Sequence, residues 1–211
     1  KYNAKVLVTK NEPIFHINKQ KALDMTTGEW VLNLDADEVV SPNLAKEIKK
    51  IISMNDQELE LYESNIKNSL FVRHQNAVEA RDGKIGSDVG PYTAFFIPRL
   101  NYFLGSFIKH GGVYPDGVIR LVKKDCANFP SKSVHEQMAI EGRVGWLKND
   151  LLHYADQSFS RYLTRFNRYT DLEAKKVTGR VVINLIWNSL FDKHQGFLFL
   201  YFRHLGILDG I

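Results

Sequence analysis

The chain has 211 residues, of which 44% are hydrophobic and 25% are charged, close to the averages of globular domains. These values exclude a disordered chain, a collagen-like repeat and a protein buried mainly in a membrane, and they predict one domain, with or without an appendage, around a sizeable core. The formal net charge of +4 lies in the tail, because residues 157–211 hold eight basic and four acidic residues while the rest is balanced.

Cysteine content and the start of the chain bear on its compartment. The single cysteine, Cys126, excludes an intramolecular disulfide and a cysteine zinc site, and it favours a reducing compartment. No signal peptide opens the sequence. Because the chain begins at Lys1 rather than at a methionine, we expect native sequence upstream of it.

Strands and helices are predicted to alternate over the first fifty residues. The β-branched run at residues 5–9 predicts a strand, residues 18–25 a helix, and residues 30–34 a buried strand. Ser41 and Pro42 then supply an N-cap and a first helical residue. Apolar residues follow them at helical spacing: Leu44, Ile48, Ile51 and Ile52. This alternation predicts an α/β fold with a parallel sheet.

The middle of the chain contains a helical excursion and further strands. Residues 54–90 predict a charged helical stretch followed by a loop. Strands are predicted at residues 92–97 and 118–122, with a loop rich in aromatics and glycine at 101–112 between them.

The tail combines basic and apolar residues. Residues 159–176 predict a helix with basic residues among aromatic ones, and apolar runs follow at 181–191 and 196–202. Neither run reaches the length of about 20 residues that a membrane-spanning helix needs. Short apolar helices with basic flanks can lie in a membrane interface, but two helices packed on the body of the protein explain the pattern equally well.

Asp35 and Asp37 form a DXD cluster at the end of the strand predicted at residues 30–34. Residues two apart in a strand share a face, so both carboxylates could address one divalent cation of the kind that is shared with substrate phosphates. Ligands of open α/β sheets bind beyond the carboxyl ends of strands, which is where this cluster lies. The alternative is a solvated acidic turn whose charge favours the start of the following helix.

Two further residues are candidates for chemistry. Glu136 follows His135, but Ala139 breaks the zinc-protease pattern H-E-x-x-H, which leaves Glu136 as a possible general base or a surface carboxylate. His153 follows two leucines, a setting that by itself favours a core histidine over a ligand. Phosphate-binding, nucleophile-elbow and dinucleotide motifs are missing from the sequence, and no nucleic-acid module is found, so nucleic acid is not a predicted partner.

A series of motifs in a fixed order resembles one enzyme family. The motifs are GEWVLNLDADE from Gly28, RLNYFLG from Arg99, KHGG from Lys109, YPD from Tyr114, RL from Arg120, VHE from Val134 and LHY from Leu152. Together they resemble bacterial family 2 glycosyltransferases, and within that family the lipopolysaccharide core glycosyltransferases.

The resemblance implies a fold, substrates and site residues. It implies part of a GT-A sheet with flanking helices, a nucleotide-sugar donor, a glycolipid or glycan acceptor, and Mg²⁺ or Mn²⁺. By it, Asp37 would bind the metal on the donor diphosphate and Asp35 would face the metal or the ribose. Glu136 would be the base that activates the acceptor hydroxyl, and His153 a metal or diphosphate ligand. The acceptor side would include Arg99, Tyr102, His110 and Asp116.

The resemblance also organises the chain. Residues 1–156 would be a partial catalytic domain with an insertion at 54–90, and residues 157–211 a basic amphipathic helical tail. The family has an upstream strand-helix-strand unit for the nucleotide base, so we expect the chain to be truncated at its N-terminus, which leaves open whether it is active by itself. The expected location is the cytoplasm, with contact on the inner face of the cytoplasmic membrane as one interpretation of the tail. The competing function is a non-catalytic membrane-surface or assembly module on a decayed transferase core.

Overall fold

A computed structural model describes residues 4–10, 15–66, 68–130, 137–156, 158–176 and 199–209. The chain forms two compact units. Unit 1 comprises Lys1–Ala36, Val40–Pro98 and Gly117–Leu151. Unit 2 comprises Asp37–Val39, Arg99–Asp116 and Leu152–Ile211. Helices and sheets occur together, so the prediction of the α/β class is confirmed.

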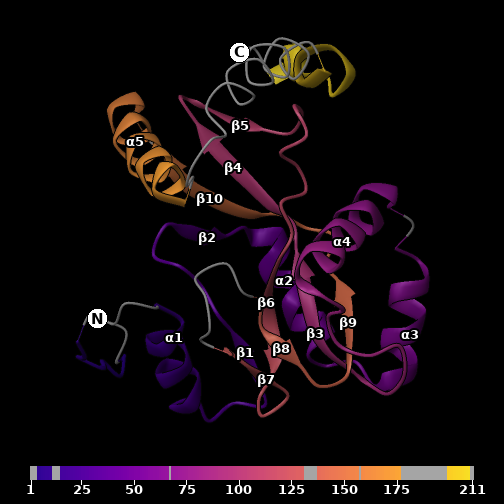
Figure 1. The fold of residues 1–211 in the computed structure, drawn as a ribbon. Helices are drawn as coiled ribbons and strands as arrows, with labels where there is room; N and C mark the ends of the chain where they lie inside the picture. Colours follow the sequence, from indigo (N-terminus) through magenta and orange to yellow (C-terminus); the bar gives the residue numbers. More distant parts are fainter. Residues whose placement is uncertain are drawn as a thin grey trace. The chain divides into compact units, whose positions relative to one another are not determined.

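Unit 1 is built on a four-stranded sheet in the order β1-β6-β3-β9 (Figure 1). Its strands are β1 (Trp30–Leu32), β6 (Val118–Lys123), β3 (Tyr92–Ile97) and β9 (Arg143–Trp146). β6 runs antiparallel to both β1 and β3, whereas β3 and β9 are parallel. All of β3 is buried, and strands pair with both of its edges. A short antiparallel ribbon of β7 (Ala127–Asn128) and β8 (Ala139–Ile140) completes the strands described in this unit.

The helices of unit 1 begin and end where local signals place them. They are α1 (Phe15–Asp24), α2 (Pro42–Ile51), α3 (Asp56–Ser64) and α4 (Ser69–Asp82). Ser41 caps α2, because its Oγ accepts the Leu44 N–H at 3.2 Å. Leu44 and Ile51 share one face of that helix and are fully buried in the core around Phe95. The helices predicted at residues 18–25 and after Ser41 are therefore confirmed as α1 and α2.

The region 54–90, where a helical stretch is predicted, contains α3 and α4, and both helices pack on the sheet of unit 1. Phe71 of α4 stacks on Trp146 of β9 at 4.4 Å between ring centroids, and Trp146 stacks in turn on Phe96 at 4.7 Å. Gly117 makes this possible, since a Cβ at its position would lie 2.3 Å from the Trp146 ring. The region is thus part of the core of unit 1.

Glu47 on α2 anchors the turn that contains Lys148 and Asn149. One carboxylate oxygen accepts the Tyr62 hydroxyl at 2.5 Å and the Lys148 N–H at 2.9 Å. The other accepts the backbone N–H and the side-chain amide of Asn149, both at 2.9 Å. One half-buried side chain therefore satisfies donors from a helix and from a turn.

We expect Glu47→Ala to lower the free energy of unfolding by about 2 kcal/mol, because hydrogen bonds to charged groups are worth about 1.5–3 kcal/mol and water can replace some of them. Urea denaturation measures the loss. Lys49→Ala, at an exposed position of the same helix, serves as the control and should stay within about 0.5 kcal/mol of the wild type. Equal effects of the two substitutions would contradict this role of Glu47.

Two expectations for the start of the chain are wrong. Residues 5–9 do not form a strand, and Val6 and Val8 are 80% and 90% exposed. A β-branched run becomes a strand only where another strand pairs with it. Here β1 pairs with β6 and not with residues 5–9. The sheet is consequently mixed rather than parallel.

Unit 2 contains a second four-stranded sheet, in the order β2-β10-β4-β5. Its strands are β2 (Glu38–Val40), β10 (Leu151–Asp156), β4 (Arg99–Phe103) and β5 (Ser106–Ile108). β4 and β5 form an antiparallel hairpin where a loop is expected. The hairpin turns at Leu104 and Gly105, whose φ angles of 44° and 105° are both positive. Leucine rarely adopts positive φ, so of the two turn residues only Gly105 indicates this turn in the sequence.

The helix α5 (Phe159–Lys176) confirms the helix predicted for the tail. Its Tyr162 ring contacts Phe103 of β4 at 5.2 Å, while Phe159, Phe166 and Tyr169 are 50–55% exposed. A π-helical turn, Phe199–Arg203, and a 3-10 turn, Gly206–Asp209, follow. The apolar run at 181–191 and the start of the run at 196–202 lie outside the described residues. Within the part of the chain that is described, no helix combines the length and the apolar character needed to cross a membrane.

Candidate active site

The sheet of unit 2 brings Asp37 and His153 together from distant parts of the sequence. Asp37 precedes β2, His153 lies on the neighbouring β10, and the Tyr154 N–H donates to the Asp37 carbonyl at 2.8 Å. His153 Nε2 consequently lies 3.7 Å from Asp37 Oδ2. The side chains are 15% and 35% exposed, so a small ligand can reach both.

The other ring nitrogen of His153 joins a chain of polar contacts within unit 2. Its Nδ1 lies 2.5 Å from Asn101 Oδ1, and the amide nitrogen of Asn101 donates to Asp116 Oδ2 at 2.8 Å. Arg99 forms ion pairs with Asp116 at 2.9 Å and with the buried Glu38 at 3.4 Å. The imidazole is therefore held on one side and open towards a carboxylate on the other.

His153 favours its neutral form in this surrounding. Burial lowers the pKa of His153 below its ordinary value of 6.5, and the positive charge of Arg99 lowers it further. The carboxylates of Asp37, Glu38 and Asp116 oppose this shift without reversing it. Neutral imidazole is the form that binds metal ions.

Asp35 belongs to unit 1 and is paired with two cations there. Lys19 Nζ of α1 lies 2.6 Å from Asp35 Oδ1, and the buried Arg120 of β6 contacts the other carboxylate oxygen. Partial burial raises the pKa of Asp35, but the hydrogen bond from Lys19 and the charge of Arg120 outweigh it, so the pKa lies below its ordinary value. Lys19 also lines a cavity of about 230 Å³ between α1 and the end of β1. The sequence alone assigns no role to Lys19 or Arg120.

Asp37 and His153 fit a divalent cation as two of its ligands. Two atoms that each lie about 2.1 Å from one ion are at most about 4.2 Å apart, so the observed 3.7 Å is compatible with joint ligation. No group of three or more metal-ligating side chains occurs among the described residues. Other ligands would come from substrate phosphates and water, as is usual for Mg²⁺ sites.

The residues predicted for the acceptor side all lie in unit 2, in three different surroundings. Arg99 and Asp116 belong to the polar chain behind His153. The Tyr102 ring contacts Tyr154, with 5.3 Å between centroids, on the neighbouring strand β10. His110 lies in the loop after β5, where its Nδ1 contacts Asp209 Oδ1 at 2.8 Å.

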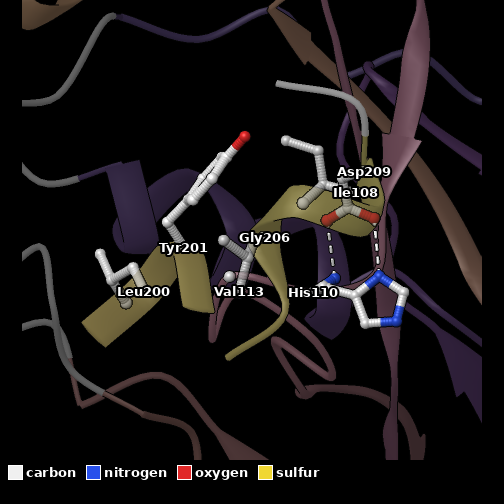
Figure 2. A pocket seen from close by; sticks show the side chains of 8 residues that line it. Ile108, His110, Val113, Leu200, Tyr201, Gly206 and Asp209 are labelled. Atoms are coloured by element: carbon white, nitrogen blue, oxygen red, sulfur yellow. Dashed lines mark hydrogen bonds and ion pairs between the residues drawn. The ribbon is translucent and has the colours of Figure 1, made fainter. Parts of the chain in front are cut away.

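A pocket of about 430 Å³ lies beside His110 (Figure 2). Asp209 closes one side of it by accepting the backbone N–H groups of Lys109 and His110. The other lining groups are apolar or glycine: Ile108, Gly111, Val113, Leu200, Tyr201 and Gly206. The pocket is thus apolar with one polar edge, and Asp209 was missed by the sequence reasoning as one of its residues.

Asn101 is a further residue that sequence reasoning missed. Arg99 and Asn101 are two apart on β4 and therefore share a face, but the sequence analysis expects a loop from Asn101 onwards. The predicted base, Glu136, lies outside the described residues together with His135.

Comparisons with known proteins assign no family. No family model matches the chain, and no solved structure gives a significant match.

Proposed function

We propose that the chain carries the catalytic residues of an inverting, metal-dependent glycosyltransferase, which moves a sugar from a nucleotide-sugar donor to a glycolipid or other glycan. The observation that carries the proposal is the pairing of Asp37 with His153, since the motif series assigns both to the metal and the diphosphate. A carboxylate and a neutral imidazole, partly exposed, are suitable ligands for a cation shared with phosphates.

The mechanism assigns a task to each side chain. Asp37 and His153 would hold Mg²⁺ or Mn²⁺, which supplies charge neutralisation at the departing diphosphate. Glu136 would accept the proton of the acceptor hydroxyl as that oxygen attacks the anomeric carbon. The bond to the diphosphate breaks on the opposite face, so the anomeric configuration inverts.

The pocket beside His110 supports a glycolipid as the acceptor. Its walls are almost wholly apolar, and sugar hydroxyls buried there would lose hydrogen bonds to water without replacement. An acyl chain has no such cost. The lipid part of an acceptor therefore fits this pocket better than its sugar part does.

The test is sugar transfer by the protein, with labelled nucleotide sugars and lipopolysaccharide-core or other glycolipid acceptors. We expect transfer with Mn²⁺ or Mg²⁺, loss of transfer after chelation, and a product of inverted configuration. Glu136→Gln should lower the rate with little effect on donor binding. Transfer that is unchanged by both chelation and Glu136→Gln would contradict the proposal.

A second candidate function is a non-catalytic membrane-surface module, and α5 is the observation that favours it. The aromatic side chains of Phe159, Phe166 and Tyr169 recur at helical spacing and are half exposed. Basic residues occupy other positions of the helix: Arg161, Arg165 and Arg168. An apolar stripe with basic neighbours suits an anionic lipid surface.

We expect the chain to adsorb to vesicles that contain anionic lipid and to detach as salt rises past about 0.15 M, where the Debye length is about 8 Å. The double substitution of Phe159 and Phe166 by serine should weaken adsorption at least about tenfold, since each phenyl ring loses part of the roughly 1.5–3 kcal/mol of its burial. Vesicle co-sedimentation measures both effects.

Leu61→Ser is the matched control, because Leu61 is 66% exposed on α3 of unit 1. Adsorption that is absent or independent of salt would contradict the membrane interpretation of the tail. Adsorption together with donor binding at background level would favour the non-catalytic module over the transferase.

A further inference from the structure

The orientation of the Asn101 amide follows from its neighbours in unit 2. Asp116 Oδ2 forms an ion pair with Arg99 at 2.9 Å and accepts a hydrogen bond from Asn101 Nδ2 at 2.8 Å. An ionised carboxylate has no proton to donate, so the group that faces it must be the amide nitrogen of Asn101. The ion pair with Arg99 thereby fixes which way the amide points.

The orientation of Asn101 in turn decides where His153 carries its proton. With the amide nitrogen turned to Asp116, Asn101 presents its carbonyl oxygen to His153 Nδ1 at 2.5 Å. A carbonyl oxygen can only accept, so Nδ1 must hold the hydrogen of the neutral ring. Nε2 is then left with a lone pair, and Nε2 is the nitrogen that lies 3.7 Å from Asp37.

We propose that Asn101, oriented by Asp116, is a positioning residue that fixes His153 in the Nδ1–H tautomer and keeps Nε2 available to ligate a divalent cation. The identity of the ligand as a divalent cation rests on the proposed function, whereas the tautomer of His153 does not. The partner of the non-ligating nitrogen commonly sets the orientation and basicity of a metal-binding histidine. Here that partner is an amide held by an Asp–Arg ion pair.

Nitrogen NMR of the chain labelled at histidine tests the tautomer directly, in the absence of metal. At pH 8, well above the ordinary histidine pKa of about 6.5, the two ring nitrogens of each neutral histidine have separate shifts that identify the protonated one. The His153 signals are assigned by their loss in His153→Gln. We expect Nδ1–H in the wild type and a shift of the population to Nε2–H in Asn101→Leu.

A second variant changes Asp116, which is connected to the His153 ring through Asn101. Asp116→Gly removes the carboxylate that orients Asn101, and glycine suits the positive φ of 38° at this position. With the constraint removed, the amide can turn over, and we expect a mixture of the two tautomers. Asn167→Leu, on the exposed surface of α5, is the matched control and should leave the His153 signals unchanged.

Mn²⁺ alone is the probe for ligation, with its affinity measured by calorimetry. We expect Asn101→Leu to weaken Mn²⁺ binding by about 10–100-fold, as is usual when the partner of a ligating histidine is lost. A wild-type Nε2–H tautomer, or a tautomer unaffected by Asn101→Leu, overturns the inference even if Mn²⁺ binds. A tautomer shift without any loss of Mn²⁺ affinity also overturns it. Where the tautomer shifts as expected but the wild type does not bind Mn²⁺, the positioning by Asn101 stands and the proposed function is contradicted.

Discussion

Asp37→Asn is expected to lower sugar transfer about 10³-fold. Asparagine keeps the shape of the side chain and removes its charge, and the Tyr154 hydrogen bond is unaffected because it ends on the backbone carbonyl of Asp37. Charge stabilisation at a departing diphosphate is worth several kcal/mol, and each 1.36 kcal/mol corresponds to a factor of ten in rate. The measurement is kcat/KM for transfer at saturating Mn²⁺.

Asp88→Asn is the matched control for Asp37→Asn. The Asp88 side chain is 82% exposed in unit 1 and pairs only with Lys84 among its charged contacts described here, so its loss should leave transfer within about twofold. Circular dichroism of both variants checks that the fold is intact. If Asp37→Asn retains more than a tenth of the wild-type rate, Asp37 does not act at the reacting diphosphate.

Elements with strong local signals could be predicted from the sequence. Ser41 and Pro42 start α2, and Leu44 and Ile51 fall on one face of it, so capping and periodicity agree. The run of apolar residues at Tyr92–Ile97 matches β3 because that strand is buried along its whole length. In these segments the local preference and the tertiary surroundings favour the same structure.

Pairing between distant segments could not be predicted in the same way. The run at residues 5–9 has the composition of a strand but remains exposed, while β4 and β5 pair through a turn that begins with Leu104. The direction of β1 depends on β6, which lies far along the chain. The composition of a segment indicates that it can pair as a strand. It does not indicate which strand it pairs with or in which direction.

In the candidate site, too, local patterns could be predicted from the sequence and contacts between distant residues could not. The motif series singles out Asp37 and His153, but only the structure shows how Asn101 connects the His153 ring to Asp116. Asp35 resembles Asp37 in the sequence, yet it is held by Lys19 and Arg120 in the other unit. Neighbouring carboxylates with the same local pattern therefore have different surroundings, which are set by residues that the pattern does not include.

Glu63 on α3 is a half-buried carboxylate that should make the stability of unit 1 depend on pH. Its Oε1 accepts the Trp146 N–H at 2.7 Å and lies where a side chain at Gly145 would be, 2.3 Å from the Cβ position. Burial raises the pKa of Glu63 from 4.5 to about 7, and it outweighs the Trp146 hydrogen bond and the charge of Arg143, which lower it. The folded state therefore binds the Glu63 proton more tightly than the unfolded state does.

We expect the free energy of unfolding to decrease by about 3 kcal/mol through this group as pH rises from 4.5 to above 7. Between these values the unfolded chain has released the proton and the folded chain has kept it, so the slope with pH is negative, at about 1.36 kcal/mol for each unit. Glu63→Gln removes the dependence, because glutamine is neutral at every pH and its amide oxygen can still accept the Trp146 N–H. Relative to the wild type, the variant should thus gain stability between pH 5 and pH 8.5.

Urea titrations of wild type and variant at both pH values measure this gain, and other titrating groups cancel in the difference. Glu60→Gln is the control on the same helix, since Glu60 is exposed and the Arg143 hydrogen bond lowers its pKa. Glu60 is therefore ionised in both states over most of the window, and the effect of its substitution should vary little with pH. Parallel pH profiles of the wild type and Glu63→Gln would contradict the raised pKa of Glu63.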